Sequence, residues 1–145
     1  MTNDDLIRRV ADELEIRNAI AKLSLLTDHH DDLDAYAEIF AEDVRWEVRL
    51  NLKPSTPTVV HGREAMRAAS AQRRREGAGP GSHRCHVVPM TAVTLHGDEA
   101  EAESIMTFYA NADTKPEVVS MGIYRDKFVR TPQGWKIKER LILQA

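Results

Sequence analysis

The second half of the chain consists of long segments that alternate apolar and polar residues and are separated by short turns. The segments are His83–Leu95, Glu99–Ala110, Glu117–Arg130 and Trp135–Leu143. Such alternation is typical of β-strands that bury one face. The connections are as short as His96–Asp98, which favours antiparallel neighbours. We therefore predict a four-stranded antiparallel meander, and strands of this length should twist into a curved sheet.

The first part of the chain has helical periodicity instead. From Leu6 to Leu26 apolar residues recur at spacings near three and four, which predicts an amphipathic helix. Asn3 is its expected N-cap, a break is expected near Leu14, and the helix should end around Asp28–His30.

Two further helices and a strand are predicted before the meander. A short helix carries Leu33, Tyr36, Ile39 and Phe40, and a third helix spans Arg63–Arg75 with Ala65, Met66, Ala69 and Gln72 facing inward. The alternating stretch Asp43–Leu52 predicts a first strand, Lys53–Pro57 a loop, and Val59–Val60 a short extended piece. Three helices followed by a sheet predict an α+β fold, a cone with the helices packed on one face of a curved, mostly antiparallel sheet that encloses a pocket.

Size and charge narrow the classes of protein. The 145 residues suit a single domain over residues 1–145. The net charge of −3, from 20 basic and 23 acidic residues, argues against a nucleic-acid partner. No apolar stretch approaches the roughly 20 residues of a membrane span. The N-terminus does not resemble a signal peptide, and the single cysteine, Cys85, favours a cytoplasmic setting.

Acidic residues and histidines gather at the end of the first helix, where the sequence reads TDHHDD. Asp31 and Asp32 are interpreted as helix caps, because aspartate is a preferred N-cap residue. Asp28 is the candidate for function. The run Arg73–Arg75 is interpreted as a solvated helix end whose charge complements the helix dipole.

Several motifs together resemble the SnoaL-like branch of the nuclear-transport-factor-2-like (NTF2-like) superfamily. They are the Asp-x-x-Asp helix end, LDAYAEIFAEDVRW, HGREAM, HRCHV, GDEAEAES and GIYRDKFVRTPQGWKI. The resemblance covers nearly the whole chain and implies the cone fold. Because this superfamily hosts isomerases, dehydratases, dioxygenase small subunits and non-enzymes, the resemblance is specific for fold and not for reaction.

Within the superfamily, the catalytic pattern is most similar to scytalone dehydratase, where an aspartate ends the first helix and a histidine lies on the first long strand. The resemblance places Asp28 and His86 on these positions and Tyr124 on a pocket-lining position. Counting back from Phe40 instead places His29 on the aspartate position. The second catalytic histidine of that enzyme has no match here, which argues against the scytalone reaction itself.

An Asp–His pair is suited to acid/base chemistry, because histidine changes charge near neutral pH and a carboxylate can fix its tautomer. Val88, Met90 and Ala92 are expected to share the strand face of His86 and to form an apolar wall. The alternative is a core histidine bonded to the backbone. The expected substrate-binding residues are Tyr124, His29, Trp46, Met106 and Phe108. For Trp46 a core role is the favoured alternative.

No metal site is predicted, because His83 and His86 are three residues apart on a strand and so face opposite sides. The leading functional hypothesis is a cofactor-free lyase or isomerase, with dehydratase-type chemistry on a small, largely apolar hydroxy- or keto-compound. The alternative is a non-catalytic binding or assembly subunit that resembles a dioxygenase small subunit. A homo-oligomer, dimer or trimer, is expected because apolar residues such as Val87, Val93, Val119, Met121 and Ile123 are predicted on the outer sheet face.

Overall fold

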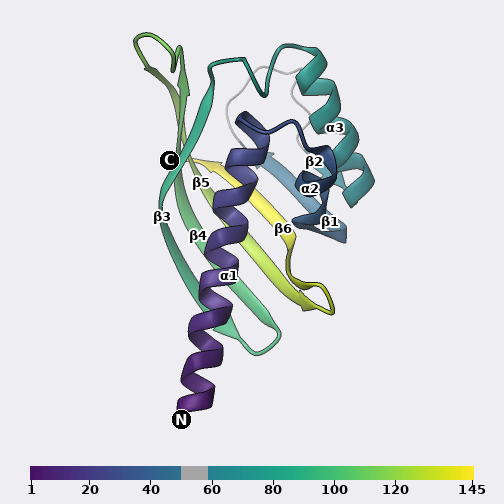
Figure 1. Ribbon diagram of the computed structural model, residues 1–145, viewed down its shortest axis with the longest axis vertical. Coiled ribbons are helices and arrows are strands. Elements are labelled where there is room, and N and C mark those ends of the chain that lie inside the picture. The colour runs from purple at the N-terminus through teal and green to yellow at the C-terminus, as the bar shows by residue number, and fades with distance from the viewer. Residues whose placement is uncertain (50–58) are drawn as a thin grey trace.

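The chain folds into helices that cover one face of a curved six-stranded sheet, as a computed structural model shows for residues 1–49 and 59–145 (Figure 1). The elements are α1 (Asn3–Asp28), α2 (Leu33–Glu38), β1 (Phe40–Arg49), β2 (Val59–His61), α3 (Arg63–Arg75), β3 (Cys85–His96), β4 (Glu99–Ala110), β5 (Glu117–Thr131) and β6 (Gly134–Gln144). The predicted α+β class and the four-stranded meander are confirmed. The predicted end of the first strand at Leu52 and the loop Lys53–Pro57 lie outside the described residues.

Helix α1 is one continuous helix, so the predicted break near Leu14 is wrong. Its N-cap is Thr2 rather than Asn3, and the Thr2 hydroxyl accepts a hydrogen bond from the backbone N–H of Asp5. The second half of α1 buries Ile16 and Ile20 against the sheet, whereas Leu14 is 57% exposed. The first turns of the helix project beyond the body of the protein (Figure 1). Packing of the second half therefore fixes the position of the helix C-terminus, where Asp28 lies.

The sheet has the strand order β2-β1-β6-β5-β4-β3. Strands β3 to β6 pair with their sequence neighbours in antiparallel fashion, and β1 pairs with β6 in parallel. Strand β1 begins at Phe40, three residues before the predicted start at Asp43. The parallel pairing carries β1 and β2 alongside the end of the chain. There, α2 and α3 pack on them and close the wide end of the cone (Figure 1).

A β-bulge changes which residues of β3 face inward. Val87 pairs with Thr107 but Met90 pairs with Ile105, so β3 holds one extra residue at this point. As a result Met90 is 62% exposed on the outer face. Thr91 instead faces inward and its hydroxyl bonds Ser104 Oγ at 2.9 Å. The expected wall of Met90 and Ala92 beside His86 is therefore wrong, because a bulge reverses the alternation that follows it.

The same bulge corrects the outer face of the sheet. Val93 was expected there but packs against the main core instead. Val119 and Met121 are exposed as expected, at 57% and 49%. In α3, Met66 is buried as predicted, but Ala65 and Gln72 are exposed, and Ser70 is the second buried residue of the helix.

The helices of the described ranges include none that is both long and apolar enough to cross a membrane.

Candidate functional site

A cavity of about 280 Å³ lies between the C-terminal end of α1, helices α2 and α3, and the inner face of the sheet. Its apolar lining includes Leu23, Phe40, Trp46, Phe108 and Ile142. Polar groups line it as well, from α1, α2, α3 and strands β3, β5 and β6. A small, mostly apolar cavity with a few convergent polar groups is the usual form of a site for a small molecule.

Asp28 and His86 lie side by side in the wall of this cavity. The Asp28 side chain is 4% exposed, and its Oδ1 lies 2.9 Å from Nδ1 of the His86 ring. The other oxygen, Oδ2, accepts a hydrogen bond of 2.6 Å from the backbone N–H of His86. The expected direct contact between these two residues is thus present, and it joins the end of α1 to the start of β3.

This geometry orients the imidazole ring. Since a carboxylate only accepts hydrogen bonds, Nδ1 is the ring nitrogen that carries a proton toward Asp28, which leaves Nε2 for a ligand. The ring of Phe108 stacks on His86 with centroids 4.4 Å apart. The arrangement holds one imidazole in a fixed tautomer and plane at an apolar cavity. This is what a general base requires.

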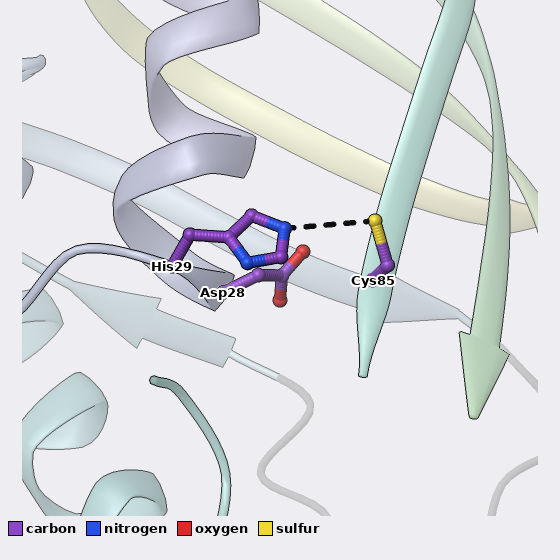
Figure 2. Close-up of side chains that lie close together, drawn as sticks. All are labelled: Asp28, His29 and Cys85. Atoms are coloured by element: carbon purple, nitrogen blue, oxygen red, sulfur yellow. Dashed lines mark hydrogen bonds between the residues drawn. The ribbon is translucent and has the colours of Figure 1, made fainter. Parts of the chain in front are cut away.

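His29 does not take the place of Asp28. It is the exposed C-cap residue of α1 and does not line the cavity. Its Nε2 lies 3.7 Å from the Cys85 sulfur, and the His29 ring lies beside the Asp28 carboxylate (Figure 2). Burial raises the pKa of the Cys85 thiol, and the Asp28 charge raises it further, so the thiol stays protonated at neutral pH. A protonated thiol is a poor nucleophile.

Atoms of Asp28, His29 and Cys85 that can bind a metal lie within 4.8 Å of one another (Figure 2). Both Asp28 oxygens already accept hydrogen bonds from His86. To bind a cation the Asp28 carboxylate would have to give up these hydrogen bonds, which already account for its position.

Tyr124 lines the cavity from β5 and is 5% exposed. Burial raises the pKa of Tyr124 to about 12, so its hydroxyl remains a hydrogen-bond donor over the physiological range. The guanidinium of Arg140 lies over the ring, 4.0 Å from its centroid. Arg140 is itself fixed by two hydrogen bonds, of 2.7 and 2.8 Å, to buried Asp126, which lies directly opposite it on β5.

The remaining predicted ligand residues divide into two groups. Trp46 and Phe108 line the cavity. Met106 does not, and is instead buried behind it in a small core cluster with Val48, Tyr124 and Ile142. Met106 therefore supports the wall from behind, and Phe108, on the same face of β4, provides the surface that a ligand would contact.

Two arginines at the end of α3 were missed as site residues. Arg74 is only 13% exposed; it donates hydrogen bonds to the carbonyls of Leu26 and His30 and pairs with Asp31. Arg73 lines the cavity and donates a hydrogen bond of 3.2 Å to the hydroxyl of Tyr36. Of the predicted solvated run, only Arg75 is exposed.

Helical spacing contained the signal for these two residues. Met66 and Ser70 are the buried positions of α3, and Arg73 and Arg74 follow Ser70 by three and four residues on the same face. Asp31 was interpreted as a cap but forms the ion pair with Arg74, whereas Asp32 caps α2 as predicted.

Comparison with solved structures shows the fold. An NTF2-like protein with a cystatin-like fold from Novosphingobium aromaticivorans has a TM-score of 0.82 and 25% identity, over 97% of this chain and 86% of that chain. A protein of unknown function from Nostoc punctiforme has a TM-score of 0.76 and 19% identity, over 93% and 92% of the two chains.

A third similar structure, also from Novosphingobium aromaticivorans, is provisionally assigned as the β subunit of an aromatic-ring-hydroxylating dioxygenase. Its TM-score is 0.71 and its identity 20%, over 95% of this chain and 91% of that chain. No curated protein matches the chain. The profile of the SnoaL-like domain matches residues 8–141, almost the full length. The chain therefore belongs to the SnoaL-like family of the NTF2-like superfamily.

Proposed function

We propose that the protein is a lyase or isomerase that uses Asp28 and His86 as an acid/base pair on a small, largely apolar hydroxy- or keto-compound. The observation that carries the proposal is the 2.9 Å contact between Asp28 Oδ1 and His86 Nδ1 in the wall of an apolar cavity. An imidazole held in this way can accept a proton on Nε2 while the carboxylate stabilises the imidazolium that results.

In a dehydration, His86 would take the proton from the carbon next to a carbonyl. The electron pair of that C–H bond forms the C=C bond, and the C–O bond to the β-hydroxyl breaks. The hydroxyl leaves as water with the proton returned by the imidazolium. In an isomerisation the proton returns to another carbon. Neither reaction changes the overall oxidation state of the substrate.

Tyr124 has a supporting role in this scheme. Since its hydroxyl stays protonated, it can donate a hydrogen bond to the carbonyl oxygen as negative charge develops there. Burial of the ring and its contact with Arg140 hold this donor in place.

The test is turnover of a panel of β-hydroxyketones and β,γ-unsaturated ketones, followed by single-turnover kinetics. Asp28→Asn and His86→Gln should each lower the rate by about two to four powers of ten, the usual contribution of a general acid or base. The double variant should be little worse than the poorer single variant, because the pair acts as a unit. Arg75→Ala is the matched control. Normal turnover by both single variants would make the pair structural.

The alternative proposal is a binding or assembly subunit, and the outer face of the sheet favours it. Met90, Ile105, Val119 and Met121 expose apolar side chains there, at 62%, 36%, 57% and 49%. Such a surface is typical of an interface. The same surface supports the expected homo-oligomer of two or three copies.

Light scattering at micromolar concentration should therefore give a multiple of the 16.4 kDa chain mass. Met121→Glu should shift the mass toward the monomer, because it places a charge in the interface, whereas Lys22→Glu at an exposed position of α1 should not. A monomeric wild type contradicts this prediction. An inactive wild type that copurifies with a larger oxygenase subunit would favour the assembly function.

A further inference from the structure

The charges around the cavity are unevenly compensated. Arg140 and Arg74 line it, but each already has a carboxylate partner, Asp126 and Asp31 respectively. Arg73 and Arg84 also line the cavity, and within the described ranges no carboxylate lies within ion-pair distance of either guanidinium. Arg84 is exposed, whereas Arg73 is partly buried. Arg73 donates a hydrogen bond of 3.2 Å to the hydroxyl of Tyr36. Asp28 is the only acidic side chain among the described lining residues, and it is engaged with His86.

Arg73 is positioned by its helix and by the hydrogen bond to Tyr36. It lies in the last turn of α3, one turn beyond buried Ser70, and is itself partly buried. Tyr36, whose hydroxyl accepts this hydrogen bond, is 2% exposed. Burial raises the pKa of Tyr36, so its hydroxyl remains neutral. A guanidinium has five N–H donors, and Tyr36 uses one of them.

We infer that the substrate carries an acidic group, such as a carboxylate, which Arg73 binds. The inference rests on the proposed function, because it names the class of compound that the Asp28–His86 pair would act on. Arginine is the side chain best suited to a carboxylate, since two parallel N–H groups match its two oxygens. Partial burial strengthens this attraction relative to a surface site. The tyrosine hydroxyl holds the guanidinium without neutralising it.

The acidic group is a binding handle and not the reacting carbonyl. Removing a proton next to a carboxylate would place a second negative charge on the same group, which makes that proton far less acidic than one next to a ketone. The substrate class is therefore a small hydroxy- or keto-compound with a separate acid group, for which the apolar residues contact the carbon skeleton.

The experiment compares an acid with its neutral isostere. Calorimetry with 2-naphthoate and 2-naphthamide should show that the wild type binds the acid at least tenfold more tightly. Arg73→Gln should abolish this preference by weakening acid binding alone, and Arg73→Lys should keep part of it. Arg75→Gln, an exposed residue of the same helix end, is the matched control and should keep the wild-type preference. Circular dichroism and thermal unfolding confirm that each variant is folded.

Equal affinity of the wild type for the acid and the amide would overturn the inference, as would equal weakening of both ligands in Arg73→Gln. Neither result bears on the acid/base pair. Conversely, full turnover by Asp28→Asn and His86→Gln would remove the proposed function but leave an acid preference that depends on Arg73 in place. The two claims can therefore fail separately.

Discussion

Helix α1 carries two buried carboxylates in very different settings. Asp12 and Asp28 are 8% and 4% exposed, so burial alone does not distinguish them. Asp12 accepts hydrogen bonds of 2.9 and 2.8 Å from Arg130 and one of 2.9 Å from the Trp135 indole. Asp28 faces a histidine at the cavity.

The difference lies in the partner and in access to the cavity. Arg130 is permanently charged, and it also bonds Asp98 and lies over the Trp135 ring, so every member of the Asp12 cluster has a partner and Arg130 cannot take part in proton transfer. The partner of Asp28 is a histidine, the residue type most often used for proton transfer in catalysis, and it lines the cavity. A buried acid therefore suggests chemistry when its partner titrates and a ligand can reach it, and suggests structure when its partner is a fixed cation.

The largest expected effect tests this contrast in kinetics. Asp28→Asn should lower turnover by about two to four powers of ten. Asp12→Asn should leave kcat within about twofold at a temperature where the variant is folded, because Asp12 lies outside the cavity. Single-turnover rates on the same substrate give both numbers. A comparable loss in both variants would break the comparison.

The reverse pattern is expected for stability. Asp12→Asn should lower the free energy of unfolding by about 1–3 kcal/mol, because it removes hydrogen bonds to a charged group and leaves the buried indole N–H with a weaker partner. Urea unfolding at pH 7 measures the loss. Asp28→Asn, which keeps an oxygen to accept the backbone N–H of His86, is expected to lose less.

The pH dependence of that stability difference has a defined sign. Hydrogen bonds from Arg130 hold the pKa of Asp12 below its usual value, with Trp135 adding to the effect. The folded state therefore binds the proton less readily than the unfolded state, so the contribution of Asp12 is present above the unfolded pKa of about 4. It disappears as the pH falls through the folded pKa. The stabilities of the wild type and Asp12→Asn should converge in this acid range, which unfolding curves from pH 6 downward can show.

The smallest expected effect separates neighbouring arginines. Arg74→Ala should lower the free energy of unfolding by about 1–2 kcal/mol, because Arg74 bonds the carbonyls of Leu26 and His30 on either side of Asp28 and thereby holds the end of α1 in place. Arg75→Ala should stay within about 0.5 kcal/mol, as is usual for an exposed position. Thermal unfolding compares the two. Equal losses would mean that the α1–α3 contact does not support the site.

Much of the fold followed from the sequence because it depends on local patterns. The alternation of the meander and the spacing of Ile16, Ile20 and Leu23 are visible in any short window. The position of Asp28 near His86 required the family resemblance, because the two residues are 58 positions apart. The Asp12–Arg130 pair spans 118 positions, and no motif marks it.

Errors arose where a local rule was overridden. Simple alternation predicts that every second residue of β3 faces inward past Pro89, but one extra residue at this point reverses which side chains face inward. The Arg73–Arg75 run was interpreted by composition, although helical spacing places two of the three on the buried face. In both cases the environment in the folded protein decides which side chains are buried. In β3 it is the pairing with β4, and in α3 it is the wall of the cavity.

The bulge in β3 also bears on how copies of this protein can meet. Strand β3 is the last strand of the sheet, so its outer edge is a template on which a strand of another molecule can add. The extra residue breaks the regular spacing of that edge, and Pro89 offers it no backbone N–H. Continuous strand addition along β3 is thereby hindered. If copies associate as proposed above, the face of the sheet rather than the edge of β3 would form the contact, and a face-to-face contact can stop at a closed complex instead of growing into a fibril.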